Sequence, residues 1–434
     1  MNDFPGQVRP LSFLVPVYRQ DRRSAWYIQA GLWMYRALAR DPAFAGGQRL
    51  SRHEVELLEP ALDRKDLQAA FLYDDGQADW PERAALEYAR QAEEMGAVAY
   101  NHLPATKLLV EGRRVVGVET AAGEFRASLT INAAGAWIDH VRGLLPGERK
   151  DLLLTRLNGA HIVLRPFAGA PSRAVYHEAR SDGRPFFIVP WRELLLIGTT
   201  ETPYEGDPDN VTPSAGEVDY LLAETNGLFP DARLTPDDVC YAYCGSRPLV
   251  RASAANMNKA SREHGCFDHE REEGLAGLLT LIGGKLTTAP SFAREALSAA
   301  MAKLGRPAPQ PRRRRPGPAT SGVVDADRLT RVYGPRAREV KRLLAARPEL
   351  DLPVVAESPV TVAEILYAVE SEKARTLGDI LLRRTGLAYH PDYRPEWACQ
   401  VAETAAAPLH WSDAAVQKHL ASFQSELDRT LIRP

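Results

Sequence analysis

The chain has 434 residues, more than one ordinary hydrophobic core accommodates, so two or three domains are expected. Its hydrophobic content of 45% and charged content of 25% are typical of a globular protein, and a formal net charge of −2 gives no indication of nucleic acid binding. No apolar run reaches the roughly eighteen residues that cross a membrane, no signal peptide is expected, and four cysteines without framework spacing fit a reducing cytoplasm.

The first part of the chain predicts helices followed by a group of strands. Residues 1–24 are polar and irregular in pattern, and a helix is expected over Trp26–Arg40, with an apolar stripe and arginines near both ends. Those arginines would let the helix lie on a membrane surface; the alternative is a helix packed through its stripe, with the arginines in water. Further helices are expected from Ser51, which opens a capping box, to Pro60 and over Pro81–Met95, and strands at 106–111, 114–120 and 124–130.

Short strands dominate the middle of the chain, and two of its strands end in small residues. The strand at 124–130 continues into Ile131-Asn-Ala-Ala-Gly-Ala-Trp137, where a backbone could approach a ligand closely. A buried strand from Leu278 ends at Gly283-Gly284, and a helix follows. A strand, a glycine pair and a helix start together place backbone N–H groups where they can face an anion or an electron-rich ring.

A segment rich in proline and arginine, 307–318, divides the chain. It predicts an extended linker, after which helices are expected at 325–346, 361–372, 376–384 and 412–432. We therefore expect a mixed α/β domain over residues 1–305, a linker over 306–321 and an all-helical domain over 322–434.

A few side chains suggest chemistry. Arg247 follows a strand end, Arg262 lies in a polar loop and Lys285 follows the glycine pair, so three cations from separate segments could converge on a phosphate dianion. His161 begins a strand, where it could exchange a proton near neutral pH. Taken singly, each is more often a surface charge or a structural histidine. No metal site is expected, because the cysteines at 240 and 244 would lie about 13 Å apart on one strand, too far to share a zinc ion.

Several segments, in order and spacing, resemble the FAD-dependent glycerol-3-phosphate dehydrogenases, which have the D-amino-acid-oxidase-like flavoprotein fold. The segments are Asn158-Gly-Ala-His-Ile-Val163, Phe187-Ile-Val-Pro-Trp191, Ile197-Gly-Thr-Thr-Glu-Thr-Pro-Tyr-Glu-Gly-Asp-Pro208, Gly245-Ser-Arg-Pro-Leu249 and Ile282-Gly-Gly-Lys-Leu-Thr-Thr288. The resemblance implies an α/β (α+β mixed) FAD-dependent oxidoreductase fold, with an antiparallel-sheet substrate domain and a C-terminal all-helical domain.

The same resemblance implies a reaction and a cofactor. Glycerol 3-phosphate would be oxidised to dihydroxyacetone phosphate, with a hydride passing to FAD and electrons passing on to quinone. By position, His161 matches the histidine near the substrate and becomes the candidate base, and the cations Arg247, Arg262 and Lys285 match residues around the substrate phosphate. The residues that match flavin-contacting backbone are Asn132, Ala133, Ala134, Gly135, Gly283, Gly284, Lys285, Leu286, Thr287 and Thr288.

The chain departs from the family's pattern mainly at its front. The family begins with a strand, Gly-x-Gly-x-x-Gly and a helix that hold the FAD pyrophosphate, and this sequence contains no such glycine motif. The resemblance thus implies that the N-terminal Rossmann βαβ unit is missing, through a misassigned start or a real truncation, and we expect these 434 residues alone to bind FAD poorly. A yellow purified protein with dehydrogenase activity would contradict this. Asn158 stands where the family usually has lysine, and Ala289-Pro290 where it usually has an aromatic residue.

Two alternative functions stay open at this point. One is a redox-inactive remnant that at most binds a phosphorylated small molecule. The other is a related flavin oxidase of amines or amino acids, against which three cations argue, because a carboxylate needs fewer. The expected partners are glycerol 3-phosphate, a quinone or other electron acceptor, a membrane surface met from the cytoplasm and a second copy of the chain, with no nucleic acid among them.

Overall fold

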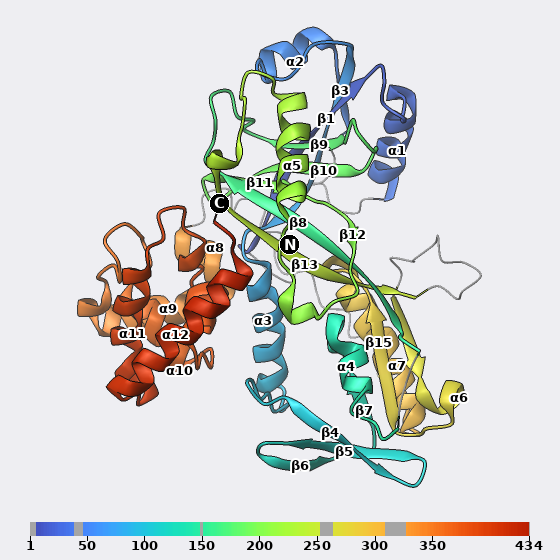
Figure 1. Ribbon diagram of the computed structural model, residues 1–434, viewed down its shortest axis with the longest axis vertical. Coiled ribbons are helices and arrows are strands. Elements are labelled where there is room, and N and C mark those ends of the chain that lie inside the picture. The colour runs from blue at the N-terminus through green and yellow to red at the C-terminus, as the bar shows by residue number, and fades with distance from the viewer. Residues whose placement is uncertain (1–5, 39–46, 148–150, 252–263, 309–326, 434) are drawn as a thin grey trace.

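A large sheet forms the centre of the molecule (Figure 1). The computed structural model describes residues 6–38, 47–147, 151–251, 264–308 and 327–433. Within these residues the sheet has nine strands in the order β12-β8-β11-β10-β9-β1-β3-β2, with β13 also paired to β8. Of these described strand pairs, only β1 and β9 run parallel. The strands are β1 Val8–Tyr18, β2 Gln48–Leu50, β3 Leu67–Ala78, β8 Leu154–Leu164, β9 Ala174–Glu178, β10 Pro185–Trp191, β11 Leu194–Gly198, β12 Thr202–Pro203 and β13 Val239–Val250.

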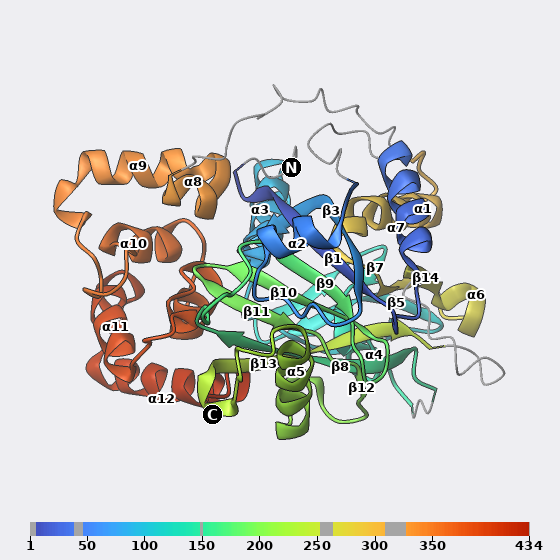
Figure 2. The ribbon, with the colours of Figure 1, turned by 90° about the horizontal axis from the view of Figure 1, so that it is seen from above.

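Different helices cover the two faces of this sheet. Alternate residues of a strand point to opposite faces, and on β8 the side chain of Ile162 packs with Val218 of α5, whereas Val163 packs into a core built largely by C-terminal helices. Figures 1 and 2 show α5 and the C-terminal helices on different sides of β8 and β13. Apart from three helices that accompany the small sheets, the described helices before the C-terminal group are α1 Ala25–Leu38, α2 Arg52–Leu58, α3 Pro81–Glu94 and α5 Ala215–Leu228.

Two small sheets lie at the lower end of the molecule in Figure 1. In one, β15 lies between β14, to which it is antiparallel, and β7, to which it is parallel. The other is an antiparallel meander of β4, β5 and β6. Their elements are β4 Ala105–Glu111, β5 Arg114–Thr120, β6 Gly123–Arg126, β7 Thr130–Asn132, β14 His264–Asp268 and β15 Leu278–Gly283, accompanied by α4 Ile138–Arg142, α6 His269–Glu273 and α7 Ala289–Lys303.

The helices after residue 327 form one group beside the sheet (Figures 1 and 2). The group packs on the sheet through a shared apolar core, and it also contacts α3, where the buried guanidinium of Arg83 pairs with the buried carboxylate of Glu372. The group contains α8 Arg328–Tyr333, α9 Ala337–Ala346, α10 Val362–Glu370, a π-helical turn over Asp379–Arg384, α11 Pro395–Leu409 and α12 Asp413–Thr430. In the part of the chain that the structure describes, no helix combines the length and apolarity needed to cross a bilayer.

The fold class is confirmed, and most of the predicted elements are present with shifted ends. The prediction of an irregular segment over residues 1–24 is wrong, because Val8–Tyr18 forms β1, paired along its whole length with β3. That partner is distant in sequence and was not predicted either. The single helix expected over 325–346 is divided between α8 and α9 at Gly334-Pro335, since a proline has no N–H to continue the helical ladder. Helix α11 was not predicted.

Candidate active site

One face of the paired strands β8 and β13 carries the candidate catalytic residues. Tyr243 of β13 lies opposite His161 of β8, and Gly245 lies opposite Gly159. Arg247 follows two residues further along β13, so it points to the same face. This face is the one opposite to α5, because α5 packs on the alternate residues of β8. The register of two strands therefore brings a histidine and an arginine from distant segments onto one surface.

His161 is held between a tyrosine and a glycine. Its ring stacks on that of Tyr243, with centroids 5.1 Å apart and planes 12° apart. On β11, Gly198 lies against the same ring, and a Cβ at this position would clash with the imidazole. Burial, and secondarily the charge of Arg247, lower the pKa of His161 to about 4, so the ring is neutral at pH 7. Its Nδ1 is buried without a hydrogen-bond partner among the described residues. The ring is thus fixed and in the form that can accept a proton.

The guanidinium of Arg247 reaches across β8 above Gly159. A Cβ on Gly159 would lie 2.5–2.7 Å from guanidinium atoms, so only glycine leaves this path open. Nη1 donates to the carbonyl oxygen of Thr200 at 3.1 Å, and Nη2 donates to Oγ1 of Thr199 at 2.8 Å. The carboxylate of Glu201 lies 3.9 Å from Nη1. These contacts hold the guanidinium two strand positions from His161, where its charge reaches the imidazole.

The two small-residue turns predicted to contact flavin lie at the same edge of the small sheet. Thr280 of β15 lies opposite Asn132 of β7 in the parallel pair, so both strands end on one side. Asn132 is buried and ties its own turn together, since Nδ2 donates to the carbonyl of Ile138 at 2.9 Å and Oδ1 accepts from the N–H of Ala134 at 3.3 Å. Its side chain therefore holds the turn together, and the exposed residues of this turn include Ala133 and Gly135.

The turn after β15 needs its glycines. Gly283 and Gly284 have φ of +73° and +98°, a region in which other residues are strained. A short 3-10 turn over Leu286–Thr288 then leads into α7, and Oγ1 of Thr288 accepts from the N–H of Lys285 at 3.1 Å. The side chain of Lys285 is exposed. The described contacts do not join it to Arg247, and Arg262 lies outside the described residues, so the predicted three-cation cluster stays a prediction.

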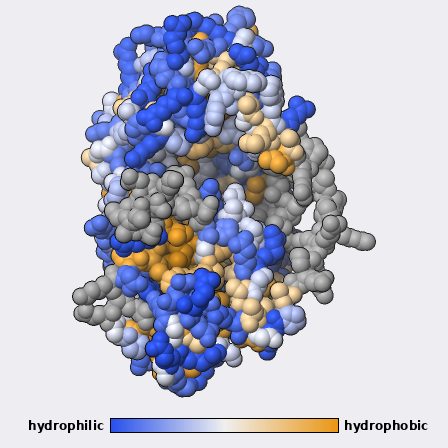
Figure 3. All heavy atoms as spheres, turned by 90° about the vertical axis from the view of Figure 1, so that its right-hand side faces the viewer, coloured by the Kyte–Doolittle hydropathy of each residue, from blue (hydrophilic) through white to orange (hydrophobic). Residues whose placement is uncertain are grey.

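These two turns fit the ring end of a flavin cofactor. The carboxyl ends of neighbouring parallel strands form the crevice in which open α/β sheets bind ligands. A Cβ on Gly135 would meet nothing within 4 Å, and the nearby apolar side chains of Ile131, Trp137 and Leu286 are exposed. Figure 3, which faces the side of α1 and α7, shows a recess with apolar side chains gathered beside it. For the pyrophosphate end, the sequence offers no Gly-x-Gly-x-x-Gly, so the expected weak FAD binding stays a prediction.

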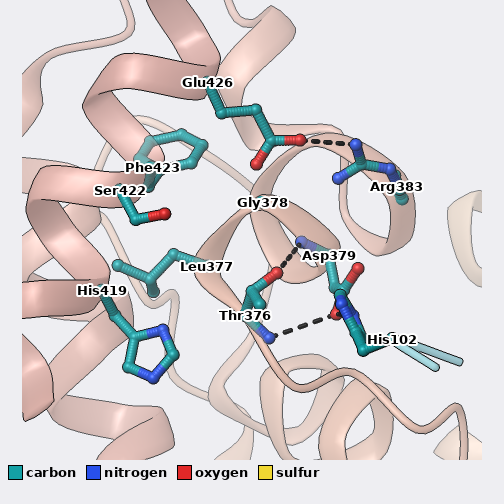
Figure 4. A pocket seen from close by; sticks show the side chains of 10 residues that line it. All are labelled: His102, Thr376, Leu377, Gly378, Asp379, Arg383, His419, Ser422, Phe423 and Glu426. Carbon is teal, nitrogen blue, oxygen red and sulfur yellow. Dashed lines mark hydrogen bonds and ion pairs between the residues drawn. The ribbon is translucent and has the colours of Figure 1, made fainter. Parts of the chain in front are cut away.

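A pocket of about 260 Å³ lies elsewhere, between His102 and the C-terminal helices (Figure 4). Its charged side chains are paired with one another, His102 with Asp379 at 2.6 Å and Arg383 with Glu426. None of the predicted site residues lines it. We therefore assign it no part in the reaction.

Sequence reasoning missed the residues that shape the site around His161 and Arg247. Tyr243, Gly198 and Gly159 lie within or beside segments quoted for the family resemblance, yet nothing in their spacing shows which side chain each one borders. The role of Thr199 and Thr200 likewise becomes visible only in the structure, where both accept hydrogen bonds from Arg247. Cross-strand register is the missing signal.

Comparison with protein families gives two matches that together span most of the chain. Residues 7–298 match the family described as FAD dependent oxidoreductase. Residues 280–416 match the family described as the C-terminal domain of alpha-glycerophosphate oxidase.

Individual relatives give the same result over the whole chain. The chain is 33% identical to a glycerol-3-phosphate dehydrogenase of Synechocystis, with 99% of this chain and 83% of the relative covered. It is 28% identical to glycerol-3-phosphate dehydrogenase 2 of Mycobacterium tuberculosis, covering 99% of this chain and 76% of the relative. Among solved structures, a glycerol-3-phosphate dehydrogenase of Bacillus halodurans complexed with FAD superposes with a TM-score of 0.77 at 23% identity, covering 99% of this chain and 83% of the other, so the fold is shared.

Proposed function

The chain belongs to the FAD-dependent oxidoreductase family, in the group of the glycerol-3-phosphate dehydrogenases, and on this premise we propose that it oxidises glycerol 3-phosphate to dihydroxyacetone phosphate. The observation that carries the proposal is the placement of His161 and Arg247 on one sheet face. A guanidinium that can hold a phosphate dianion lies above Gly159, two positions from a neutral histidine that can take a proton.

Each group has its own task in this reaction. Arg247 binds the substrate phosphate through its forked N–H donors, and the contacts with Thr199 and Thr200 fix the plane of the fork. His161 takes the proton of the 2-hydroxyl, and its stacking on Tyr243 keeps the ring in one orientation. FAD, when bound, supplies the acceptor for the hydride of C2. We assign the turns after β7 and β15 to the flavin ring end.

Two further cations complete the proposed site. Lys285 follows the glycine turn at the flavin end, and Arg262 precedes β14 in sequence. Both are proposed to approach the substrate phosphate. Arginine 262 lies outside the described residues, so its part rests on the resemblance alone.

The test is flavin reduction by the substrate. Because weak FAD binding is expected, the chain is supplied with FAD in excess under anaerobic conditions, and the flavin absorbance band is expected to be lost when glycerol 3-phosphate is added. Glycerol at the same concentration should leave the band unchanged, because it lacks the dianion that Arg247 holds. Bleaching by amino acids but not by glycerol 3-phosphate would instead support an amino-acid oxidase.

We also propose quinone as the onward electron acceptor and a membrane surface, met from the cytoplasm, as the place of transfer. The support is α1, which lies on the outside of the molecule (Figures 1 and 2) and exposes 66% of Trp26, 55% of Trp33, 64% of Met34 and 73% of Leu38. Exposed tryptophans and long apolar side chains beside arginines suit a helix lying in a membrane interface. Co-sedimentation with anionic lipid vesicles tests this, and a chain that stays in the supernatant would contradict it. A second copy of the chain as partner stays a prediction.

A further inference from the structure

We propose that Glu217 is a positioning residue for Arg247 and acts through the loop of residues 199–202. The inference rests on the proposed function, because it gives Glu217 a part in aiming the guanidinium that binds phosphate. Glu217 lies in the first turn of α5, which covers the opposite face of the sheet from Arg247. A link between the two must therefore pass around the edge of β8.

The first part of this link joins Arg247 to the loop. The loop connects β11 to β12, and both strands pair with β8 on the side away from β13. Arg247 starts on β13, crosses β8 above Gly159 and donates to the carbonyl of Thr200 and the hydroxyl of Thr199. The direction of the guanidinium thus depends on where the loop lies.

The second part joins the loop to Glu217 through Thr200. While the carbonyl of Thr200 accepts from Arg247, its hydroxyl donates to Oε1 of Glu217 at 2.7 Å and accepts from the N–H of Ala160 at 2.9 Å. The hydroxyl of Thr202 donates to the same Oε1 at 3.0 Å. Thr200 is 5% exposed, so these bonds are shielded from water. One carboxylate oxygen therefore holds the loop at two points.

Glu217 is itself anchored by its other oxygen. Oε2 accepts from the N–H and from the hydroxyl of Ser214, both at 3.0 Å, in the capping box of α5. Burial alone would raise the pKa of Glu217, but the hydrogen bonds from Ser214, Thr200 and Thr202 outweigh it and lower the pKa. The carboxylate is charged at neutral pH, and each of its oxygens accepts two of these bonds. Because Glu217 is fixed at the start of α5, it fixes the position of the loop, and the loop in turn fixes the direction of Arg247.

We call the two bonds from Thr200 and Thr202 to Oε1 of Glu217 the brace. The test compares variants that affect the brace with variants that affect a helix cap. Glu217→Ala is expected to raise KM for glycerol 3-phosphate about tenfold, as for the loss of hydrogen bonds to a charged group, and to change kcat less than about threefold. Glu217→Gln keeps an oxygen acceptor for the two threonines and should restore most of the loss. Ser214→Ala removes one of the two bonds to Oε2 and leaves both threonines bonded to Oε1, so KM should rise far less than in Glu217→Ala. Glu54→Ala, which removes the matching carboxylate from the capping box of α2, is the control away from the site and should leave KM within about twofold of the wild type.

A crystal structure of Glu217→Ala reports on the brace independently of catalysis. We expect the guanidinium of Arg247 to leave the carbonyl of Thr200 and the hydroxyl of Thr199. If it keeps both contacts, or if Ser214→Ala raises KM as much as Glu217→Ala does, the proposal is overturned. A wild-type protein that does not oxidise glycerol 3-phosphate would refute the proposed function alone, and the position of Arg247 in the variant would still decide the role of Glu217.

Discussion

The ring of His161 lies parallel to that of Tyr243, 5.1 Å from centroid to centroid, on the same sheet face as Arg247. Tyr243 in turn packs against the core formed with the C-terminal helices. The orientation of the candidate base therefore depends on packing between the sheet and those helices, and not only on β8. Such indirect support is the usual way in which a catalytic side chain is held in one rotamer.

His161→Ala should lower kcat far more than it changes the affinity for glycerol 3-phosphate. Removing a general base typically costs between about 10²- and 10⁴-fold in rate, whereas the phosphate contacts of Arg247 remain. Steady-state kinetics on the FAD-reconstituted chain measure both quantities. Tyr243→Phe serves as the control, because it keeps the stacked ring and should keep most of the turnover. An unchanged kcat in His161→Ala would end the assignment of this histidine as the base.

The pKa of His161 should depend on the charge of Arg247. Burial is the main cause of its pKa of about 4, and the positive charge of Arg247 is the second. Above that pKa the ring is neutral, and it becomes charged only as the pH falls through about 4. Arg247→Ala removes a positive charge near the ring and should raise the pKa of His161. Inorganic phosphate bound beside Arg247 offsets the same positive charge and should also raise this pKa.

Histidine ring ¹⁵N chemical shifts followed against pH would measure this titration. A midpoint near the ordinary value of about 6.5 in the wild type would mean that the ring is not buried as described. A midpoint that Arg247→Ala leaves in place would mean that the two side chains do not interact.

Gly159→Ala should weaken substrate binding by displacing Arg247, although both Arg247 and His161 are retained. Its Cβ would lie 2.5–2.7 Å from the guanidinium of Arg247, so the arginine must leave its path across β8. We expect KM for glycerol 3-phosphate to rise at least about tenfold, the size of effect of losing a charge-assisted contact. Gly216→Ala in α5, where a Cβ would meet nothing within 4 Å, is the matched control. Equal KM values for the two variants would show that the space above Gly159 is not needed.

The attachment of the C-terminal helices to α3 should be sensitive to one buried pair. The side chains of Arg83 and Glu372 are 3% and 1% exposed, and Arg83 also lies over the ring of Tyr333 at 4.1 Å. Arg83→Met leaves a buried carboxylate without its main partner, which typically costs about 3–5 kcal/mol of unfolding free energy. Adding Glu372→Gln should recover part of that loss. Chemical denaturation measures both, and the exposed Arg126 provides a control substitution with no expected change. Equal stability of Arg83→Met and the wild type would contradict the prediction.

Local patterns in the sequence were sufficient to predict many of the helices and turns. The capping box at Ser51–Glu54 and the proline that begins α3 are short-range signals, and both helices start where those signals predict. The glycine pair after Leu278–Ile282 likewise predicted a turn, since only glycine adopts its backbone angles without strain. By contrast β1 was missed, because its partner strand β3 lies far along the chain.

The sequence by itself determined the residue types available for catalysis and, through their order and spacing, the family. It could not show that His161 and Arg247 meet, because their approach depends on the register of β13 against β8, and a shift of one residue would send Arg247 to the opposite face. Nor could it reveal that Gly198 and Gly159 make room for those two side chains, or that Glu217 holds the loop between them and α5. These relationships are set by long-range pairing and packing, so only the tertiary structure decided them.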